Sequence, residues 1–357
     1  MLTAIIIVSV LFQVLGAILA NAKFGKRHFI HYEPRVRPIT IIKPVKGLDG
    51  SLAICIASFL RLPFFDGDEI IFCFESVKDE AYALVERMTK DNPRCRITTS
   101  GYLRRVENPK INNIWEAFET AKNNLILISD QNVIASEHYL QIMDHEFEFP
   151  SGILTNVCSS SGGGLDATML NTFNAKWILI LNFLGASTVV GKSMMFDRRV
   201  FNRISSLNEV GEYIAEDYAF GKVYQKAGRF IEISSLSIRQ SVARGGFWSR
   251  YMRWGVMRKA HAPIPFLIEP LFYGVVTQFL TVYKFGFIAG CLFAIIWINC
   301  DITICDSVSN GPLFFPSYLF REWLAIPLWF KTIFTRTINW KGRDYVVSYG
   351  GKGDLQR

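Results

Sequence analysis

Long apolar runs at both ends of the sequence enclose a polar middle. Residues 2–20 carry no charge, and further apolar runs cover about 266–282, 285–300 and 312–333. An apolar helix of about 20 residues is long enough to cross a bilayer. We therefore expect a transmembrane anchor over residues 1–22 and transmembrane or re-entrant helices over residues 263–335.

The first run has an alternative interpretation as a cleaved signal peptide. Ala20, Asn21 and Ala22 resemble a cleavage site, but the run lacks a basic front, and Lys23 follows it at once. Basic residues collect on the cytosolic side of membrane helices. This pattern favours an anchor whose C-terminal end is cytosolic.

The last run carries Arg321 and Glu322 near its middle. Charges are unfavourable in hydrocarbon, so we expect an interfacial or re-entrant helix, or one whose charges pair inside a helix bundle. Two later spans after the anchor would also leave the basic tail, residues 336–357, in the cytosol.

The polar middle alternates strand and helix patterns. Strands are expected at 38–42, 69–74, 96–99 and 125–129, with helices near 52–60, 79–90, 112–122 and 135–145. Such alternation predicts an α/β domain with a mostly parallel sheet, over residues 36–245. The aromatic and basic stretch 246–262 is predicted to form an interfacial helix.

Composition and net charge limit the kinds of molecule that the chain is expected to bind. The 357 residues carry a formal charge of +8, with a pI near 9.1 and a mean hydropathy of +0.22. No nucleic-acid-binding motif is present, so this charge indicates anionic lipid and nucleotide diphosphate rather than nucleic acid. The seven cysteines form no C-x-x-C pair and the five histidines are scattered, which predicts neither a disulfide framework nor a zinc site.

Three acidic clusters mark the middle of the chain: Asp79, Asp130 and the pair Glu216 and Asp217. Asp130 ends an apolar strand, at the sheet edge where ligands of open α/β sheets collect, and could hold Mg²⁺ or Mn²⁺ with a diphosphate. An acid between apolar residues, as at 216 and 217, would have a raised pKa and could act as a base. Each acid could instead simply cap a helix.

Cations accompany these acids. Lys43 ends the first strand, and Lys110 precedes a helix start, so both could face a nucleotide. Arg250 and Arg253 are three apart, share a helix face and could grip two phosphate oxygens, with Trp254 beside the acceptor.

Five motifs together resemble the ceramide glucosyltransferase family, a group of membrane-anchored inverting enzymes with a GT-A fold. The resemblance runs from about Ile41 to Gly351. Its motifs are Ile-Lys-Pro-Val-Lys-Gly (42–47), Asn-Pro-Lys-Ile-Asn-Asn (108–113), Tyr-Ile-Ala-Glu-Asp-Tyr (213–218), Arg-Tyr-Met-Arg-Trp (250–254) and Thr-Ile-Asn-Trp-Lys-Gly-Arg (337–343). The second and third are the most specific.

The resemblance implies the pattern D, D, D, (Q/R)xxRW on Asp79, Asp130, Asp217 and residues 250–254. In that pattern the first two acids serve nucleotide and metal, the third is the catalytic base, and the pentad holds diphosphate and acceptor. Two residues depart from it. Glu80 stands where relatives tend to have Pro, and Gln131 where Ser commonly follows the second Asp.

These features predict an integral membrane, inverting glycosyltransferase of GT-A fold, with its catalytic domain in the cytosol at a bacterial inner membrane or a Golgi or ER membrane. It would move a hexose, foremost glucose from UDP-glucose, onto ceramide or a similar lipid, with a divalent cation. A hopanoid, diacylglycerol or polysaccharide acceptor, and a UDP-binding scaffold without turnover, remain alternatives.

Overall fold

The computed structural model describes residues 1–25, 34–148, 152–161, 164–186, 188–242, 246–340 and 343–355. The chain divides into two compact units. Unit 1 comprises Met1–Arg27, Ser159–Leu184 and Arg244–Arg357, and unit 2 comprises His28–Cys158 and Gly185–Ala243. The stretch Ser159–Leu184, expected to belong to the domain over residues 36–245, instead groups with the terminal segments.

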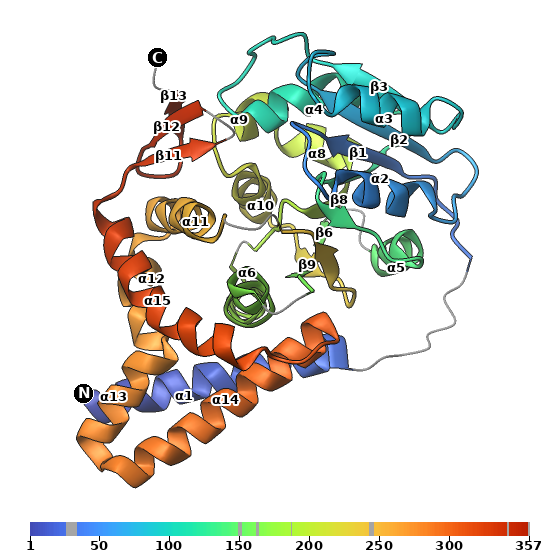
Figure 1. The fold of residues 1–357 in the computed structure, drawn as a ribbon. Coiled ribbons are helices and arrows are strands. Elements are labelled where there is room, and N and C mark those ends of the chain that lie inside the picture. The colour runs from blue at the N-terminus through green and yellow to red at the C-terminus, as the bar shows by residue number, and fades with distance from the viewer. Residues whose placement is uncertain are drawn as a thin grey trace. The chain divides into compact units, whose positions relative to one another are not determined.

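The centre of unit 2 is a seven-stranded sheet, coloured from blue to yellow in Figure 1. Its strands are β1 (Thr40–Pro44), β2 (Glu69–Phe74), β3 (Cys95–Thr99), β4 (Leu125–Ser129), β6 (Ile153–Thr155), β8 (Ser193–Asp197) and β9 (Ile231–Ile233). Their order is β3-β2-β1-β4-β8-β6-β9. The first four run parallel, whereas β8 runs antiparallel to both neighbours. A smaller sheet has the order β5-β10-β7, from Val133–Ile134, Ile238–Gln240 and Cys158–Ser159.

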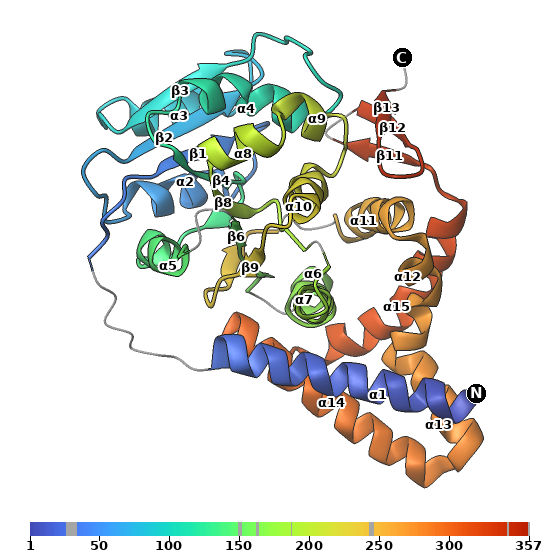
Figure 2. The ribbon, with the colours of Figure 1, turned by 180° about the vertical axis from the view of Figure 1, so that it is seen from behind.

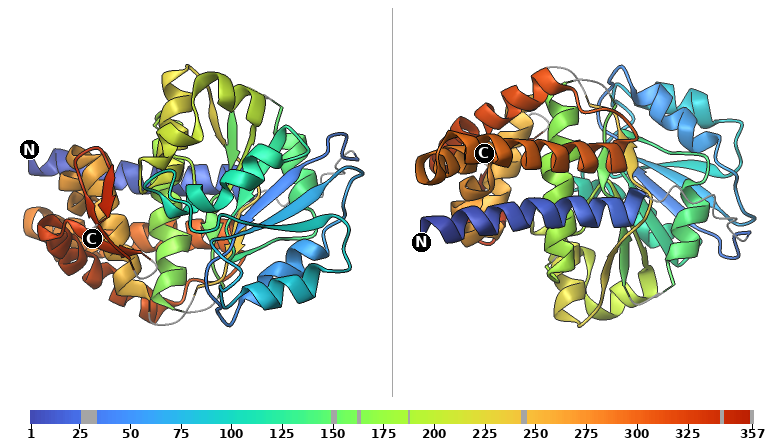
Figure 3. Two further views of the ribbon diagram at one scale, coloured as in Figure 1. Left: turned by 90° about the horizontal axis from the view of Figure 1, so that it is seen from above. Right: turned by 90° about the horizontal axis from the view of Figure 1, so that it is seen from below.

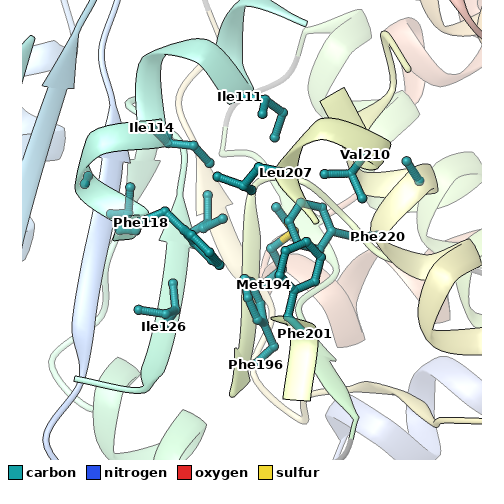
Figure 4. Packing of buried hydrophobic residues seen from close by; sticks show 14 of the residues in the cluster. Ile111, Ile114, Phe118, Ile126, Met194, Phe196, Phe201, Leu207, Val210 and Phe220 are labelled. Atoms are coloured by element: carbon teal, nitrogen blue, oxygen red, sulfur yellow. The ribbon is translucent and has the colours of Figure 1, made fainter. Parts of the chain in front are cut away.

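Helices cover both faces of the large sheet (Figure 3). They are α2 (Leu52–Leu60), α3 (Tyr82–Thr89), α4 (Pro109–Thr120), α5 (Tyr139–Glu146), α8 (Arg198–Ile204), α9 (Leu207–Gly211) and α10 (Glu216–Lys226). Successive strand residues point to opposite faces. Accordingly, Cys73 belongs to one buried cluster with Ile114 of α4 and Phe220 of α10, the last two labelled in Figure 4, while the Phe74 ring lies 5.3 Å from that of Tyr82 in α3.

The predicted strands agree with the structure at 69–74 and 125–129, and the first strand lies two residues later than expected, at Thr40–Pro44. Helix α3 begins at Tyr82 rather than at Asp79. Asp79 is therefore not its N-terminal cap. Helix α4 begins at Pro109, three residues before the expected start at 112, because Asn108 accepts hydrogen bonds from two backbone N–H groups of the first turn.

Unit 1 is built mainly of helices (Figure 2). They are α1 (Leu2–Ala20) with its extension η1 (Asn21–Gly25), α6 (Leu165–Met169), η2 (Leu170–Asn174), α7 (Ala175–Phe183), α11 (Phe247–His261), α12 (Pro263–Ile268), η3 (Glu269–Phe272), α13 (Gly274–Phe285), α14 (Phe287–Ser309) and α15 (Phe315–Phe334). The segment after α15, predicted as a plain tail, contains a three-stranded sheet of β11 (Thr337–Trp340), β12 (Arg343–Val347) and β13 (Gly353–Leu355).

Two helices of the described residues are long and apolar enough to cross a membrane. They are Leu2–Gly25 and Phe287–Ser309. The pair Pro263–Phe272 and Gly274–Phe285 is bent by 57° and would add a third span if it crosses as one. The chain is thus membrane-associated, with apolar helices at the N-terminus and in the C-terminal region as predicted.

The charges in the last apolar run pair inside unit 1, which is one of the arrangements expected from the sequence. Arg321 Nη2 lies 3.6 Å from Asp301 Oδ2 on α14 and contacts the Glu322 carboxylate. Both acids are shielded from water. Pairing reduces the penalty of burying such charges among apolar helices.

Helix α1 also makes polar contacts. Gln13 is buried, accepts a hydrogen bond from the ammonium of Lys176 on α7, and donates one of 3.2 Å to the Trp297 carbonyl on α14. Lys176 Nζ lies 3.8 Å from Asp301 Oδ1. The N-terminal helix is therefore joined to two other helices by buried polar groups as well as by apolar packing.

Candidate functional site

Asp130 follows β4 directly, so its carboxylate lies at the carboxyl edge of the parallel strands. Two ammonium groups meet it there. Lys110 Nζ lies 2.7 Å from Oδ1, and Lys192 Nζ lies 2.7 Å from Oδ2. Burial disfavours the charged carboxylate, but the two lysines outweigh that effect and hold the pKa of Asp130 below its ordinary value. Asp130 is thus ionised and fully paired at neutral pH.

Glu216 and Asp217 form the first turn of α10 and lie beside this group. Lys110 Nζ lies 2.7 Å from Glu216 Oε1, so one ammonium bridges Glu216 and Asp130. Burial raises the pKa of Glu216. The negative charges of Asp217 and Asp130 raise it further, whereas the positive charge of Lys110 lowers it without cancelling the rise. Burial also disfavours the ammonium, yet the two carboxylates prevail and raise the pKa of Lys110.

Asp217 is held by backbone N–H groups. Its Oδ2 accepts a hydrogen bond of 3.0 Å from Gly191, and its Oδ1 accepts one of 2.8 Å from Tyr218. The Gly191 carbonyl in turn accepts a hydrogen bond of 2.8 Å from Lys110 Nζ. The predicted base therefore has a fixed orientation next to the Lys110 and Asp130 pair.

Position 191 has no room for a side chain, so glycine is required there. A Cβ atom there would lie 2.9 Å from Glu216 Oε1 and 3.0 Å from Asp217 Oδ2. Contacts below 3.0 Å force a shift of the neighbouring atoms, so the segment before β8 can approach both acids only because residue 191 has no side chain.

Lys43 is buried within β1 behind Asp130. Its Nζ donates a hydrogen bond of 3.0 Å to the Asp130 carbonyl and lies 3.5 Å from the centre of the Phe59 ring. Burial lowers the pKa of Lys43 to about 7, although the nearby charges of Cys55 and Asp130 oppose this. Small changes in its surroundings can therefore change its charge at neutral pH.

Asp79 joins this group through the loop after β1. Both of its carboxylate oxygens lie 3.0 Å from the Gly47 N–H, and Oδ1 accepts a hydrogen bond of 2.9 Å from the Ala81 N–H. One residue earlier in the same loop, the Lys46 N–H donates a hydrogen bond of 2.7 Å to Oε1 of Gln131. Gln131, a departure from the family pattern, thus connects the loop that Asp79 holds to the residue after Asp130.

The pentad lies on α11 in unit 1. Arg250 donates a hydrogen bond to the carboxylate of Asp166 on α6, and the Trp254 ring lies 5.0 Å from that of Tyr251, edge to face. Arg253 follows Arg250 by three positions, on the same side of the helix. The convergence of these residues with the carboxylates of unit 2 stays a prediction.

A divalent cation does not fit the carboxylates in this arrangement. Mg²⁺ binds oxygen at about 2.1 Å and needs several such ligands. Both Asp130 oxygens instead lie 2.7 Å from ammonium groups, and the part of the chain that is described contains no cluster of three His, Cys, Asp or Glu side chains suited to a metal. The cation on Asp130 remains a prediction that this donor set does not support.

Sequence reasoning missed Gly191, Lys192 and Asp166. The first two reach the site because β8 is antiparallel, so that its first residues lie beside the last residues of β4. A strand pattern alone does not reveal strand direction. Asp166 belongs to no motif of the sequence, and its contact with Arg250 is the observation that distinguishes it.

Comparison with known proteins identifies the family. A family model described as glycosyl transferase family 21 matches residues 1–353. Ceramide glucosyltransferase 1 of Caenorhabditis elegans is 28% identical over 377 residues, covering 98% of this chain and 80% of the relative. Ceramide glucosyltransferase 3 of the same organism is 27% identical over 360 residues, covering 94% and 78%.

Among solved structures, the mannosyltransferase PcManGT of Pyrobaculum calidifontis, in complex with GDP-Man and Mn²⁺, aligns with a TM-score of 0.48 and 13% identity. The alignment covers 86% of this chain and 97% of that one. The resemblance to ceramide glucosyltransferases is confirmed by these matches, and the predicted α/β fold with a mostly parallel sheet is confirmed by the strand order and directions. The chain is a glycosyltransferase and belongs to glycosyl transferase family 21.

Proposed function

We propose that this glycosyltransferase transfers glucose from UDP-glucose to the primary hydroxyl of ceramide or a similar lipid at the cytosolic membrane face. Its membrane helices and the names of its relatives support a lipid acceptor. The observation that carries the proposal is the orientation of Asp217, held by two backbone N–H groups beside Lys110 and Asp130.

In this reaction Asp217 accepts the proton of the lipid hydroxyl while the hydroxyl oxygen attacks the anomeric carbon of the sugar. The bond from that carbon to the diphosphate breaks, and the electron pair leaves with UDP. Attack from the opposite face inverts the configuration, so an α-linked donor yields a β-linked glycolipid. Deprotonation concerted with attack is general base catalysis.

The remaining predicted residues bind the donor and acceptor. Lys43, Lys110 and Asp79 serve the nucleotide side, and Glu216 holds Lys110 in place. Asp130 orients the lysines that face the donor. From the pentad, Arg250 and Arg253 grip the diphosphate as it leaves, and Trp254 packs beside the acceptor. Holding reactants in the correct geometry can lower the activation barrier by about 7–11 kcal/mol.

The test uses the full chain in lipid nanodiscs, with radiolabelled UDP-glucose and short-chain ceramide. We expect one sugar added per lipid in β-linkage, and loss of transfer in Asp217→Asn with UDP binding retained. Asp91→Asn, at an exposed position outside the site, is the matched control. Full activity of Asp217→Asn would refute the base.

The same assay separates the alternatives. UDP-galactose tests the sugar, and diacylglycerol and a hopanoid test the acceptor. A polymer product would indicate a polysaccharide synthase. UDP binding without UDP release, whichever lipid is added, would indicate a binding protein rather than an enzyme with this activity.

A further inference from the structure

Lys192 lies at the carboxyl edge of the sheet beside Asp130, outside the five motifs of the family resemblance. The register of β8 on β4 sets Ser193 opposite Ser129, which brings Lys192 beside Asp130. A backbone hydrogen bond of 3.2 Å from the Asp130 N–H to the Lys192 carbonyl fixes this alignment. The ammonium of Lys192 then reaches Asp130 Oδ2 at 2.7 Å and Asn132 Oδ1 at 3.1 Å.

The location of this ammonium is where a divalent cation would bind Asp130. A cation on Oδ2 would have to displace Lys192, and one on Oδ1 would have to displace Lys110, since both lysines lie 2.7 Å from those oxygens. Like charges at such separations repel each other strongly in a partly buried site. The lysines therefore compete with any metal for the same carboxylate.

The two lysines differ in what they can still bind. An ammonium has three N–H donors. Lys110 contacts Asp130, Glu216 and the Gly191 carbonyl, and its side chain is 9% exposed. Lys192 has two such acceptors among the described residues, Asp130 and Asn132, and its side chain is 25% exposed. Lys192 is thus the ammonium that keeps a donor and solvent access for an anionic ligand.

We propose that Lys192 binds the diphosphate of the nucleotide-sugar donor and supplies the positive charge that a divalent cation would otherwise provide. The inference rests on the proposed function for the identity of the donor. The ammonium stabilises the negative charge that develops on the leaving diphosphate, and Asp130 and Asn132 orient it. Donor binding and sugar transfer then continue when divalent cations are removed.

The experiment measures UDP binding by calorimetry on the full chain in nanodiscs, with excess EDTA and then with added Mn²⁺. Wild type is compared with Lys192→Met, Lys192→Arg and Lys90→Met, the last at an exposed position of α3's C-terminal end. We expect wild type and Lys90→Met to bind UDP equally well with EDTA or Mn²⁺. Lys192→Met should bind about 10- to 100-fold more weakly in EDTA, the range for losing a hydrogen bond to a charged group.

Two further results sharpen the test. Mn²⁺ should restore part of the affinity of Lys192→Met, because the variant frees Asp130 Oδ2, and Lys192→Arg should retain most of the binding in EDTA. Wild type that binds UDP only with Mn²⁺ would overturn the proposal. Equal affinities of wild type and Lys192→Met in EDTA would overturn it as well.

Sugar transfer by the same samples separates the two proposals. Metal-independent UDP binding lost in Lys192→Met, without transfer to any lipid, would support the role of Lys192 and reject the proposed function. Transfer that disappears with EDTA and returns with Mn²⁺ would support the proposed function and reject the role of Lys192.

Discussion

The ammonium of Lys110 lies 2.7 Å from Glu216 Oε1, although 106 positions separate the two residues in the chain. The same ammonium lies 2.7 Å from Asp130 Oδ1. One cation thus connects the start of α4, the end of β4 and the start of α10. This connection unites acids that the sequence presents as separate clusters.

Lys110→Met should destabilise the fold because the buried Glu216 carboxylate loses its ammonium partner beside Asp130, which keeps only Lys192. Adding Glu216→Gln should recover part of the loss, because the uncharged side chain no longer needs the ammonium. Denaturant titration of both single variants and the double variant should give a coupling free energy of about 0.5–3 kcal/mol. Additive effects of the two substitutions would show that the pair is not coupled.

Gly191→Ala should reduce sugar transfer about 10- to 100-fold by displacing the Asp217 carboxylate. The new Cβ would lie 3.0 Å from Asp217 Oδ2 and 2.9 Å from Glu216 Oε1. Steady-state kinetics should show the loss mainly in kcat. Gly50→Ala is the matched control, because its Cβ would meet nothing within 4 Å. Equal losses in both variants would point to a general effect of replacing glycine.

Lys43 should take up a proton when UDP binds near pH 8. Its pKa in the free protein is about 7, so the side chain is largely neutral at that pH, and an arriving diphosphate would raise the pKa. Calorimetry in buffers of different ionisation enthalpy measures the uptake. It should fall toward zero near pH 5.5, where Lys43 is already charged.

The pH dependence of the free energy of unfolding should also reflect the titration of Lys43. Because the folded pKa of Lys43 lies below its unfolded value of 10.5, unfolding takes up a proton between pH 7 and 10.5. This group's contribution to the free energy of unfolding therefore rises with pH across that window. Lys43→Met should abolish both this contribution and the proton uptake; a pH dependence that is unchanged in the variant would assign them to other groups.

Asp166→Asn should weaken UDP binding by releasing the Arg250 guanidinium from its partner. The double variant Asp166→Arg with Arg250→Asp restores the ion pair but moves the guanidinium from α11 to α6. We expect the exchange to recover thermal stability and not UDP affinity. Recovery of both would mean that the pair acts only in folding.

Lys176→Met should destabilise unit 1 by about 1–3 kcal/mol, since the buried side-chain carbonyl of Gln13 loses its donor and Asp301 keeps only Arg321 as an ionic partner. The partners left behind are Gln13 on α1 and Asp301 on α14. Unfolding in detergent measures the change, with Lys90→Met as the exposed control. A stability equal to that of wild type would show that the Lys176 contacts contribute nothing to holding α1.

The elements with strong local patterns were predictable. The uncharged run after Met1 indicates a membrane helix because its length matches a bilayer, and the apolar runs at 69–74 and 125–129 form strands with those bounds. The start of α4 was missed by three residues, because Asn108 caps the helix at Pro109 whereas the apolar pattern placed its start at 112. The motifs singled out Asp130, Glu216 and Asp217, whose proximity the structure shows, while their roles in catalysis stay predictions.

The sequence alone determined which residue types were present for chemistry and which segments were apolar, because composition and periodicity are local properties. Only the tertiary structure decided that Lys110 bridges two acids and that Lys192 takes the second oxygen of Asp130. The Lys192 contact depends on β8 running antiparallel to β4, and strand direction is set by pairing between distant segments. The same holds for Gly191, whose missing Cβ matters only once α10 is packed against it.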